Sequence, residues 1–366
     1  MRRLSPAAPP QAGPEDAALA RRRLNFPWRR LANVLLCLLV PTLASAQIIE
    51  TVGERALGMG GAFVAVADDS SATWWNPAAL ATGPFLDLSL GWARTDVRHG
   101  GAPVARGRVT GVSLSTPPLG VSYYRFSITD IQPAGSIETT AAGREDGRAG
   151  VVRSLRLHDI GGTLLTSVFT GVHVGTTLKV LHGRVEHATG GVQLTPQALL
   201  DLGDDATGAA SQWQFDADVG VLAVTGPIRV GAVVRNLRAA EFDDGSGADL
   251  VAMRLPRQAR VGVAYDGALR RTKASPWVVS ADVDVVRYTT GTGDRRVIAA
   301  GAERWLFGKR LGIRGGGRFN QVGHNERSAT AGVSAAIRPG ILVEAHAVAG
   351  GSDDERGWGV AVRMSF

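Results

Sequence analysis

Residue types that can do chemistry occur in this chain, but they are not spaced as catalytic or metal-binding motifs. The seven histidines are scattered, and none shows the H-E-x-x-H spacing of a zinc site. No G-x-S-x-G elbow marks a nucleophilic serine, and no Walker A sequence marks a phosphate loop. The stretch GMGG at residues 58–61 lacks the G-x-G-x-x-G pattern of a dinucleotide site. We therefore expect no enzyme, no metal and no cofactor.

The adjacent carboxylates Asp68 and Asp69 have two interpretations. Carboxylate and carbonyl oxygens are the preferred ligands of Ca²⁺ and Mg²⁺, so the pair could bind a cation. The short polar side chains of residues 68–71 could instead accept hydrogen bonds from the backbone at the start of a helical turn. We favour the second interpretation.

A second group of polar residues shares one face of extended segments. Its members alternate with apolar residues, so in a strand they point away from the apolar face. They could form a polar lining of a lumen or a network that docks another segment, or they could be solvated residues with no single role. The group comprises Asp216, Asp218, Asp282, Asp284, Arg314, Glu344, His346 and Arg363.

The elements that must position these residues are predicted to be β-strands, because apolar and polar residues alternate at period two. The alternation is clear along residues 213–223, 277–285 and 358–366. Runs of about nine to thirteen residues are long enough to cross a bilayer as tilted strands. We predict fourteen such segments, near residues 85–94, 107–116, 119–128, 151–164, 170–185, 213–224, 227–237, 257–265, 276–288, 296–307, 311–319, 329–337, 341–349 and 357–366.

The connections favour a membrane barrel over a soluble β-sandwich or propeller. Short joins generally follow even-numbered segments, and longer loops such as 129–150, 186–212 and 238–256 generally follow odd-numbered ones. This is typical of outer-membrane barrels with periplasmic turns and external loops. Soluble strands average about five or six residues, which is shorter than these segments. Aromatic belts are expected at both interfaces: Phe85, Tyr265, Trp277, Phe307 and Phe366 near the turns, and Phe126, Trp213, Tyr288, Phe319 and Trp358 near the loops.

Residues 1–46 are predicted to be a cleavable signal peptide with an unusually long N-terminal extension. Arg29 and Arg30 precede an apolar stretch, residues 31–40, and the sequence ASA at residues 44–46 predicts cleavage after Ala46. The only cysteine, Cys37, falls in that stretch, so the exported chain would have no disulfide. This segment holds seven arginines and two acidic residues, so the remainder carries little of the formal charge of +7. That balance argues against a nucleic-acid partner.

A barrel of fourteen strands has a lumen that its own side chains do not fill. About eight strands leave an interior that side chains can pack, whereas sixteen leave an open aqueous channel. Residues 47–84 precede the first strand and lack its alternation, so they are the candidate plug. Their glycines, Gly58, Gly60 and Gly61, permit close backbone contact and positive φ, and Asn76-Pro77 predicts a turn or helix stop.

The segment GERALGMGGAFVAVADDSSATWWNPAAL, residues 53–80, resembles the FadL superfamily of outer-membrane barrels. The resemblance rests on Gly58, Gly60 and Gly61, on Asp68 and Asp69, and on Asn76-Pro77-Ala78. It implies a hatch at residues 47–84 inside a fourteen-stranded barrel at residues 85–366. Many members of that superfamily pass hydrophobic molecules.

The body of the chain is similar to a shorter branch, the PorV/PorQ-like proteins, at residues 215–222, 231–237 and 255–265. That similarity implies a partner of a type IX-like secretion or surface-attachment system. Two hypotheses therefore stand: a gated transporter of small hydrophobic molecules, which we rank slightly ahead, and a secretion partner. A mainly structural barrel is a third possibility.

The expected partners are outer-membrane lipid, a hydrophobic ligand or secretion-system proteins, and the barrel assembly machinery. The last expectation follows from the C-terminal residue. Outer-membrane barrels commonly end in an aromatic residue on an alternating strand, which this machinery recognises, and the chain ends at Phe366.

Overall fold

The computed structural model describes most of the chain after residue 51. The predicted signal peptide and its cleavage site lie outside the described residues, as do residues 47–51 of the predicted hatch. The described residues are 52–132, 150–190, 194–208, 210–244, 252–267, 277–290, 293–323, 326–351 and 354–366.

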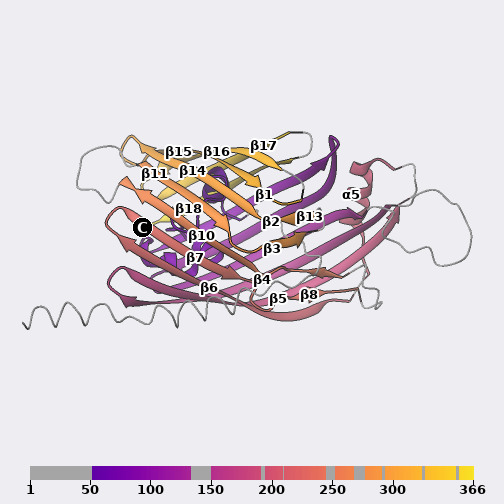
Figure 1. The fold of residues 1–366 in the computed structure, drawn as a ribbon, viewed down its shortest axis with the longest axis horizontal. Coiled ribbons are helices and arrows are strands. Elements are labelled where there is room, and N and C mark those ends of the chain that lie inside the picture. The colour runs from indigo at the N-terminus through magenta and orange to yellow at the C-terminus, as the bar shows by residue number, and fades with distance from the viewer. Residues whose placement is uncertain are drawn as a thin grey trace, which may run out of the picture. The chain divides into compact units, whose positions relative to one another are not determined.

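Fourteen antiparallel strands close into a single barrel, in which β1 pairs with both β2 and β18 (Figure 1). The fold is therefore all-β, as the alternation predicts. The barrel strands are β1 (Asp87–His99), β2 (Ala102–Thr116), β3 (Leu119–Gln132), β4 (Gly150–Phe169), β5 (Val172–Gly190), β6 (Gln212–Thr225), β7 (Ile228–Arg235), β10 (Gln258–Asp266), β11 (Trp277–Asp284), β14 (Val297–Leu306), β15 (Leu311–Asn320), β16 (Arg327–Arg338), β17 (Ile341–Gly350) and β18 (Glu355–Ser365).

Each predicted segment coincides with one barrel strand, but the strands near the N-terminus are longer than predicted. β1 continues to His99 rather than residue 94, and β5 continues to Gly190 rather than residue 185. These extensions keep their backbone pairing while their outward faces become polar, so the apolar alternation that marks a strand fades before the strand ends. One wall of the barrel, β1–β5, is therefore longer than the rest.

The predicted loops contain more structure than expected. The loop after β5 includes a helix, α5 (Pro196–Asp205), whose first turn is capped by the Thr195 side chain. Two short hairpins follow, β8 (Glu241–Phe242) with β9 (Met253–Arg254) and β12 (Tyr288–Thr290) with β13 (Gly293–Arg295). Among the described residues, no helix is long and apolar enough to span a membrane.

The alternation separates an apolar outside from a polar inside. Along β11, Trp277 and Val279 are exposed on the outer face, while Ser280 and Asp282 are buried on the inner face. The same rule places Trp213 and Phe215 outside on β6. An apolar exterior on a closed sheet suits lipid, because closure leaves no strand edge without backbone partners.

The predicted position in an aromatic belt is wrong for two residues. Phe126 is 4% exposed because it lies on the inner face of β3, and Tyr288 is 6% exposed in the β12–β13 hairpin. Trp213 and Trp358 at the loop end are exposed, as are Phe307 and Phe366 at the turn end. Here the turn end is the end that carries the short joins and the C-terminus, and the loop end is the opposite one.

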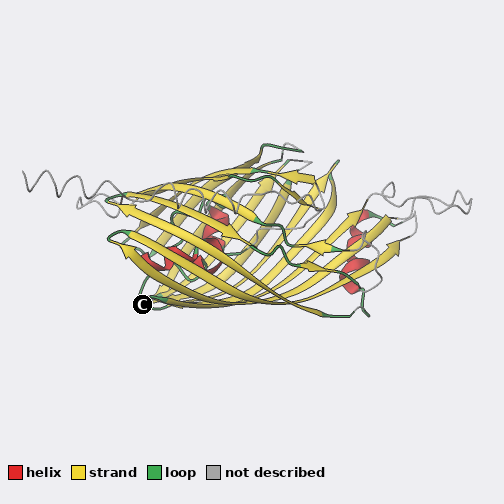
Figure 2. Cartoon of the chain, turned by 60° about the horizontal axis from the view of Figure 1, so that its bottom comes forward, coloured by secondary structure: helices red, strands yellow, loops and turns green. Residues whose placement is uncertain are grey.

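Residues 52–83, here the N-terminal segment, lie inside the barrel towards the turn end (Figure 2). The segment contains helices α3 (Glu54–Gly58) and α4 (Ala72–Trp75) and the 3₁₀ helix η1 (Pro77–Thr82). Nearly all of its residues are buried. The lumen is therefore filled at this level by a segment that is not part of the sheet.

A belt of glycines on the inner wall makes room for the N-terminal segment. A Cβ built on any of these glycines would come within 3.1 Å of an atom of that segment, which is tighter than most real Cβ contacts. The belt explains part of the high glycine content, because any larger residue would displace the segment. It consists of Gly91, Gly120, Gly175, Gly220, Gly231, Gly301, Gly316 and Gly332.

The two neighbouring glycines Gly315 and Gly316 give a matched test of this packing. A Cβ on Gly316 would lie 2.4 Å from the Met59 carbonyl carbon, whereas a Cβ on Gly315 meets only one atom, at 3.7 Å. We expect Gly316→Ala to destabilise the folded barrel by roughly 1–3 kcal/mol through overpacking, and Gly315→Ala to have little effect. The midpoint of heat-dependent gel mobility would measure both variants. Equal midpoints would contradict the proposed contact.

Candidate functional site

The glycine-rich motif packs its backbone directly against the barrel wall. Gly60 and Gly61 have φ of 72° and 79°, which is the region that glycine tolerates best. A Cβ on Gly60 would lie 2.7 Å from the Gly317 carbonyl oxygen. The hydroxyl of Thr330 on β16 donates a hydrogen bond to the Gly58 carbonyl at 3.0 Å. The motif thus sits on strands β14–β16.

Asp282, one of the polar residues identified in the sequence, accepts two hydrogen bonds from the N-terminal segment. The N–H groups of Phe63 and Val64 donate to the same Asp282 oxygen at 2.7 and 2.8 Å. These N–H groups belong to a turn rather than to regular secondary structure, so they need a partner from elsewhere. The lumen carboxylate supplies it.

The Asn76-Pro77-Ala78 motif performs both a local and a tertiary role. The Asn76 side-chain oxygen accepts from the Ala78 N–H at 3.2 Å and so caps η1. Its amide nitrogen donates to the Val64 carbonyl at 2.8 Å and to the Val221 carbonyl on β6 at 3.1 Å. A single side chain therefore joins two parts of the N-terminal segment to the wall.

Asp68 and Asp69 form ion pairs and backbone contacts. Asp68 pairs with Arg55, and Asp69 accepts from the Ser71 N–H at 3.0 Å. Arg229 on β7 lies 3.7 Å from Asp68. Within the described residues, no group of three or more His, Cys, Asp or Glu is arranged to hold a metal ion.

Six buried charges of alternating sign form a closed ring that joins the N-terminal segment to four strands. Arg55 donates to both oxygens of Glu303, at 2.7 and 2.8 Å. The remaining contacts of the ring are Glu303–Arg314 at 3.6 Å, Arg314–Glu344 at 3.9 Å, Glu344–Arg363 at 3.3 Å, Arg363–Asp69 at 3.5 Å and Asp69–Arg55 at 3.4 Å. We call these six residues the charge ring.

The sequence identified three members of the ring as lumen candidates (Arg314, Glu344 and Arg363) and Asp69 as part of the N-terminal motif, but missed Arg55 and Glu303. Glu303 occupies an inward position of β14, in a segment whose two faces are mixed in sequence, so its direction was not evident. Arg55 lies in the short helix α3, where no strand alternation applies. The one sequence feature that could have pointed to Arg55 is its charge within the glycine-rich motif.

The other polar candidates are placed on the inner wall but not in the ring. Asp218 pairs with Lys179 at 2.7 Å, and Asp284 accepts from Arg260 at 2.7 Å. Asp216 accepts from the Arg238 N–H at 2.9 Å. His346 is buried on β17, with no hydrogen-bond partner for either ring nitrogen among the described residues.

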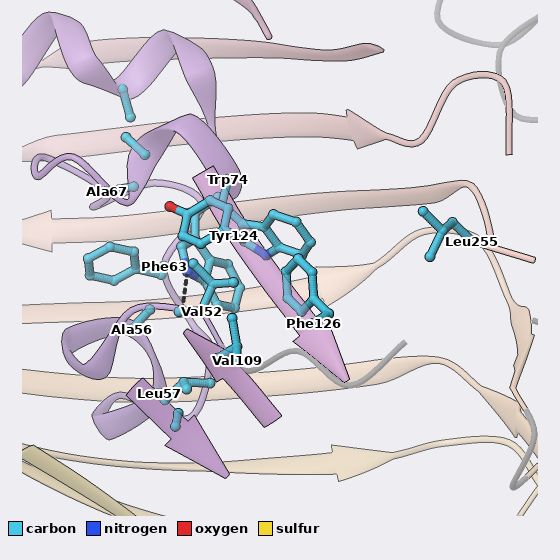
Figure 3. Packing of buried hydrophobic residues seen from close by; sticks show 14 of the residues in the cluster. Val52, Ala56, Leu57, Phe63, Ala67, Trp74, Val109, Tyr124, Phe126 and Leu255 are labelled. Carbon is cyan, nitrogen blue, oxygen red and sulfur yellow. Dashed lines mark hydrogen bonds between the residues drawn. The ribbon is translucent and has the colours of Figure 1, made fainter. Parts of the chain in front are cut away.

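An apolar cluster occupies the interior between the N-terminal segment and the loop end. Trp74 packs against Phe126 and Tyr124, with ring centroids 5.3 and 5.7 Å apart (Figure 3). The side chains beyond Trp74 come from the inner faces of β3–β5 and from the β8–β9 region. We call this set the inner apolar cluster: Phe126, Ile128, Leu155, Leu157, Leu181, Val185, Phe242, Met253 and Leu255.

A cavity of about 800 Å³ lies on the other side of the N-terminal segment, at the turn end. Arg55, Glu303 and Arg363 of the charge ring contribute to its wall, together with Trp305 and Leu342. The N-terminal segment therefore stands between an open recess and the inner apolar cluster. This interface between segment and barrel is the candidate functional site.

The carboxyl of Glu54 makes the stability of this interface depend on pH. Burial raises its pKa from 4.5 to about 8, and the negative charges of Glu344 and Asp69 act in the same direction. The folded protein therefore holds a proton that the unfolded chain releases above pH 4.5. Stability from this group is complete below pH 4.5 and is lost progressively as the pH rises towards 8.

We expect the unfolding midpoint of the wild-type barrel to fall between pH 5 and about 8. Glu54→Gln keeps the shape of the protonated side chain and cannot ionise, so its midpoint should vary less over that range. Heat-dependent gel mobility at a series of pH values would measure this. Identical pH profiles for the two proteins would refute the role of Glu54.

Comparison with known proteins gives a partial family match and a shared fold. A family model described as "F plasmid transfer operon, TraF, protein" matches residues 159–284, about a third of the chain. No curated protein matches the sequence.

Solved structures with the same fold are hydrocarbon channels. A structure titled "CymD monoaromatic hydrocarbon channel" is 15% identical, covers 88% of this chain and 99% of its own, and has a TM-score of 0.58. The Pseudomonas putida toluene transporter TodX is 13% identical, covers 87% of this chain and 98% of its own, and has a TM-score of 0.53. At this level of identity the two structures share their fold with this chain. The chain thus has the same closed barrel fold as these two channels.

Proposed function

We propose that this protein is an outer-membrane channel for small hydrophobic molecules and that residues 47–84 form its hatch. The observation that carries the proposal is the position of the N-terminal segment. It fills a closed barrel between a turn-end recess and an apolar interior, and hydrogen bonds, ion pairs and packing hold it there. The fold that this protein shares with hydrocarbon channels supports the same class of solute for it.

The inner apolar cluster suits a hydrophobic solute better than a polar one. Its aromatic and aliphatic side chains offer dispersion contacts and no charge, so an apolar molecule loses little by leaving water there. Trp74 and Phe126 form the end of the cluster that meets the hatch. A solute that enters from the loop end would therefore reach the hatch before it reaches the recess.

The charge ring is proposed to latch the hatch. Each of its members is buried, and a buried charge that loses its partner is costly, so the ring favours one closed arrangement. Only Arg55 and Asp69 belong to the hatch, so a movement of the hatch separates them from Glu303 and Arg363 together. The glycines 58, 60 and 61, with Asp68 and Asn76-Pro77-Ala78, hold the hatch in register with the wall.

A reversible crosslink tests whether the hatch must move. Ser70 in the hatch and Ser113 on β2 have their hydroxyl oxygens 2.9 Å apart, and cysteines at these positions would be close enough for a disulfide. In S70C/S113C the disulfide should reduce toluene uptake to the level of cells without the protein, and a reductant should restore it. Whole cells with an intact lipopolysaccharide layer are needed, because toluene crosses simple lipid bilayers unaided.

The matched control is T163C/T177C, whose parent hydroxyls are 2.8 Å apart on β4 and β5. That disulfide joins two barrel strands. Because the Thr177 hydroxyl also donates to the Thr73 carbonyl of the hatch, the comparison is between the oxidised and reduced forms of this variant, and their uptake should be equal. Equal uptake by oxidised and reduced S70C/S113C would show that the hatch is not a gate. Uptake no faster than in cells without the protein, in every form, would remove the transport proposal.

The alternative is a secretion or surface-attachment partner of the PorV/PorQ-like kind. Two observations favour it: the interior is filled, and the TraF family match covers residues 159–284, which include all three stretches that resemble that branch. Affinity purification in mild detergent distinguishes the two. A stoichiometric exported or periplasmic protein would support a partner role, and recovery of the barrel alone would argue against it.

Phe366 is proposed to be recognised by the barrel assembly machinery. It is exposed at the turn end, and its backbone exchanges hydrogen bonds with Leu86 at 2.9 and 3.1 Å beside the β1–β18 seam. Deletion of Phe366 should lower the amount of heat-modifiable barrel in the outer membrane while leaving synthesis unchanged. An unchanged yield would count against the assignment.

A further inference from the structure

A row of arginines crosses the outer face of the longer wall. The strand registers place Arg94 opposite Arg108, Arg108 opposite Ser127, Ser127 opposite Arg156 and Arg156 opposite Arg184. Because residues paired across strands point to the same side of a sheet, these arginines share the outer face. We call Arg94, Arg108, Arg156 and Arg184 the arginine row.

An aromatic and imidazole row lies one step nearer the turn end. The register places Arg125 opposite His158, His158 opposite His182 and His182 opposite Trp213. The ring of His182 stacks on Trp213 at 4.3 Å, and the Tyr123 hydroxyl lies 2.8 Å from Nδ1 of His158. These side chains form a continuous surface across β3–β6.

The outer face becomes fully apolar below that row, which fixes the depth of both rows. The next positions towards the turn end are Tyr123, Ile160, Val180 and Phe215, followed by residues such as Val121 and Leu178, which are exposed. Tyrosine and tryptophan concentrate at the headgroup level of membranes. The arginine row therefore lies at the headgroup level or just above it, on the side of the long loops, which in such barrels is extracellular.

Helix α5 covers the loop side of the arginine row from outside. Arg106 and Thr129, which point outward by register, are buried beneath α5 and contact Asp204 at 2.8 and 2.6 Å. Arg108 also pairs with Asp204, at 2.9 Å. The helix thus neutralises the upper side of the row and leaves the lower side open.

Two arginines remain available on that open side. Arg125 is exposed and has no hydrogen bond or ion pair with any residue in the part of the chain that the structure describes. The Arg184 side chain is 40% exposed and reaches only Glu186, at 3.6 Å. With His158 and His182 beside them, they present donors and positive charge in two adjacent rows of the outer face. A phosphate group matches both properties.

The opposite wall has no comparable surface. The outward positions of β7, β10 and β11 are uncharged throughout, with residues such as Val230, Val263 and Val279. The positive surface therefore does not extend to β7, β10 and β11, whereas a belt that merely marks the membrane boundary would surround the barrel.

We infer that the outer face of β3–β6 binds the phosphate-bearing headgroup of an outer-leaflet lipid through Arg125 and Arg184. The acyl chains of that lipid would lie along the apolar positions below, and Tyr123 and Trp213 would flank its headgroup. A lipid is favoured over a free phosphate because the arginines continue directly into a lipid-facing surface. The inference requires the barrel to span a membrane, but it does not require the hatch to move or a solute to pass.

Native mass spectrometry of the full barrel in detergent tests the inference, with diphosphoryl lipid A as the probe. We expect the wild type to retain this lipid, and R125Q/R184Q to bind it about tenfold or more weakly, because a charge-assisted contact is lost at each position. Lipid A from which both phosphates have been removed should bind the wild type as weakly. Equal retention by wild type and R125Q/R184Q would overturn the assignment, as would equal binding of the two lipids.

The matched control is Arg327→Gln. Arg327 is also an outward arginine near the loop end, but it lies on β16 and stacks over Phe319 at 5.3 Å. The R327Q variant should bind lipid A as the wild type does. A loss of lipid binding equal to that of R125Q/R184Q would show that any surface charge suffices. Displacement of the lipid by excess inorganic phosphate would show a free-phosphate site and refute the lipid assignment. Folding of each variant is checked by its heat-dependent mobility.

Discussion

The structure depends on the width of a fourteen-stranded barrel. Strand side chains alone leave such a lumen open, and an open pore would abolish the permeability barrier. The chain meets this constraint in two ways that need each other. Glycines at inward positions, such as Gly220 and Gly316, remove side chains from the wall, and the N-terminal segment occupies the space released. A glycine weakens a strand because it has no side chain to pack, and here the packing is supplied by a different part of the chain.

The same arrangement explains why the interior is polar where the N-terminal segment lies. A turn-rich segment cannot satisfy all of its own backbone groups, so the wall must offer acceptors and donors to the rest. Asp282 and Thr330 do so directly, and the charge ring adds ion pairs between buried groups. Hydrogen bonds and ion pairs of this kind are directional and non-covalent. They hold the segment in one arrangement.

The two walls of the barrel differ in what they face outside. On β7–β11 the outer surface is apolar from end to end, which suits acyl chains alone. On β1–β5 the strands continue past the apolar band, carry the arginine row and are covered by α5. Extra strand length, outward charge and a helix on the outer face therefore occur together. We attribute this to contact with the headgroup layer on that side, which is the basis of the lipid site proposed at Arg125 and Arg184.

The sequence by itself determined the number of strands and, for most of them, which residues face inward, because alternation at period two is a local property that lipid outside and a polar interior enforce. Asp282 and Glu344 could be assigned to the lumen on that basis. Only the tertiary structure decided what they contact. Arg55 and Glu303 are 248 residues apart and meet because the sheet closes. Closure, register and the path of the N-terminal segment are set by all fourteen strands together. The helix α5 and the inward orientation of Phe126 were not predicted, for a related reason. The burial of both depends on neighbours that are distant in sequence.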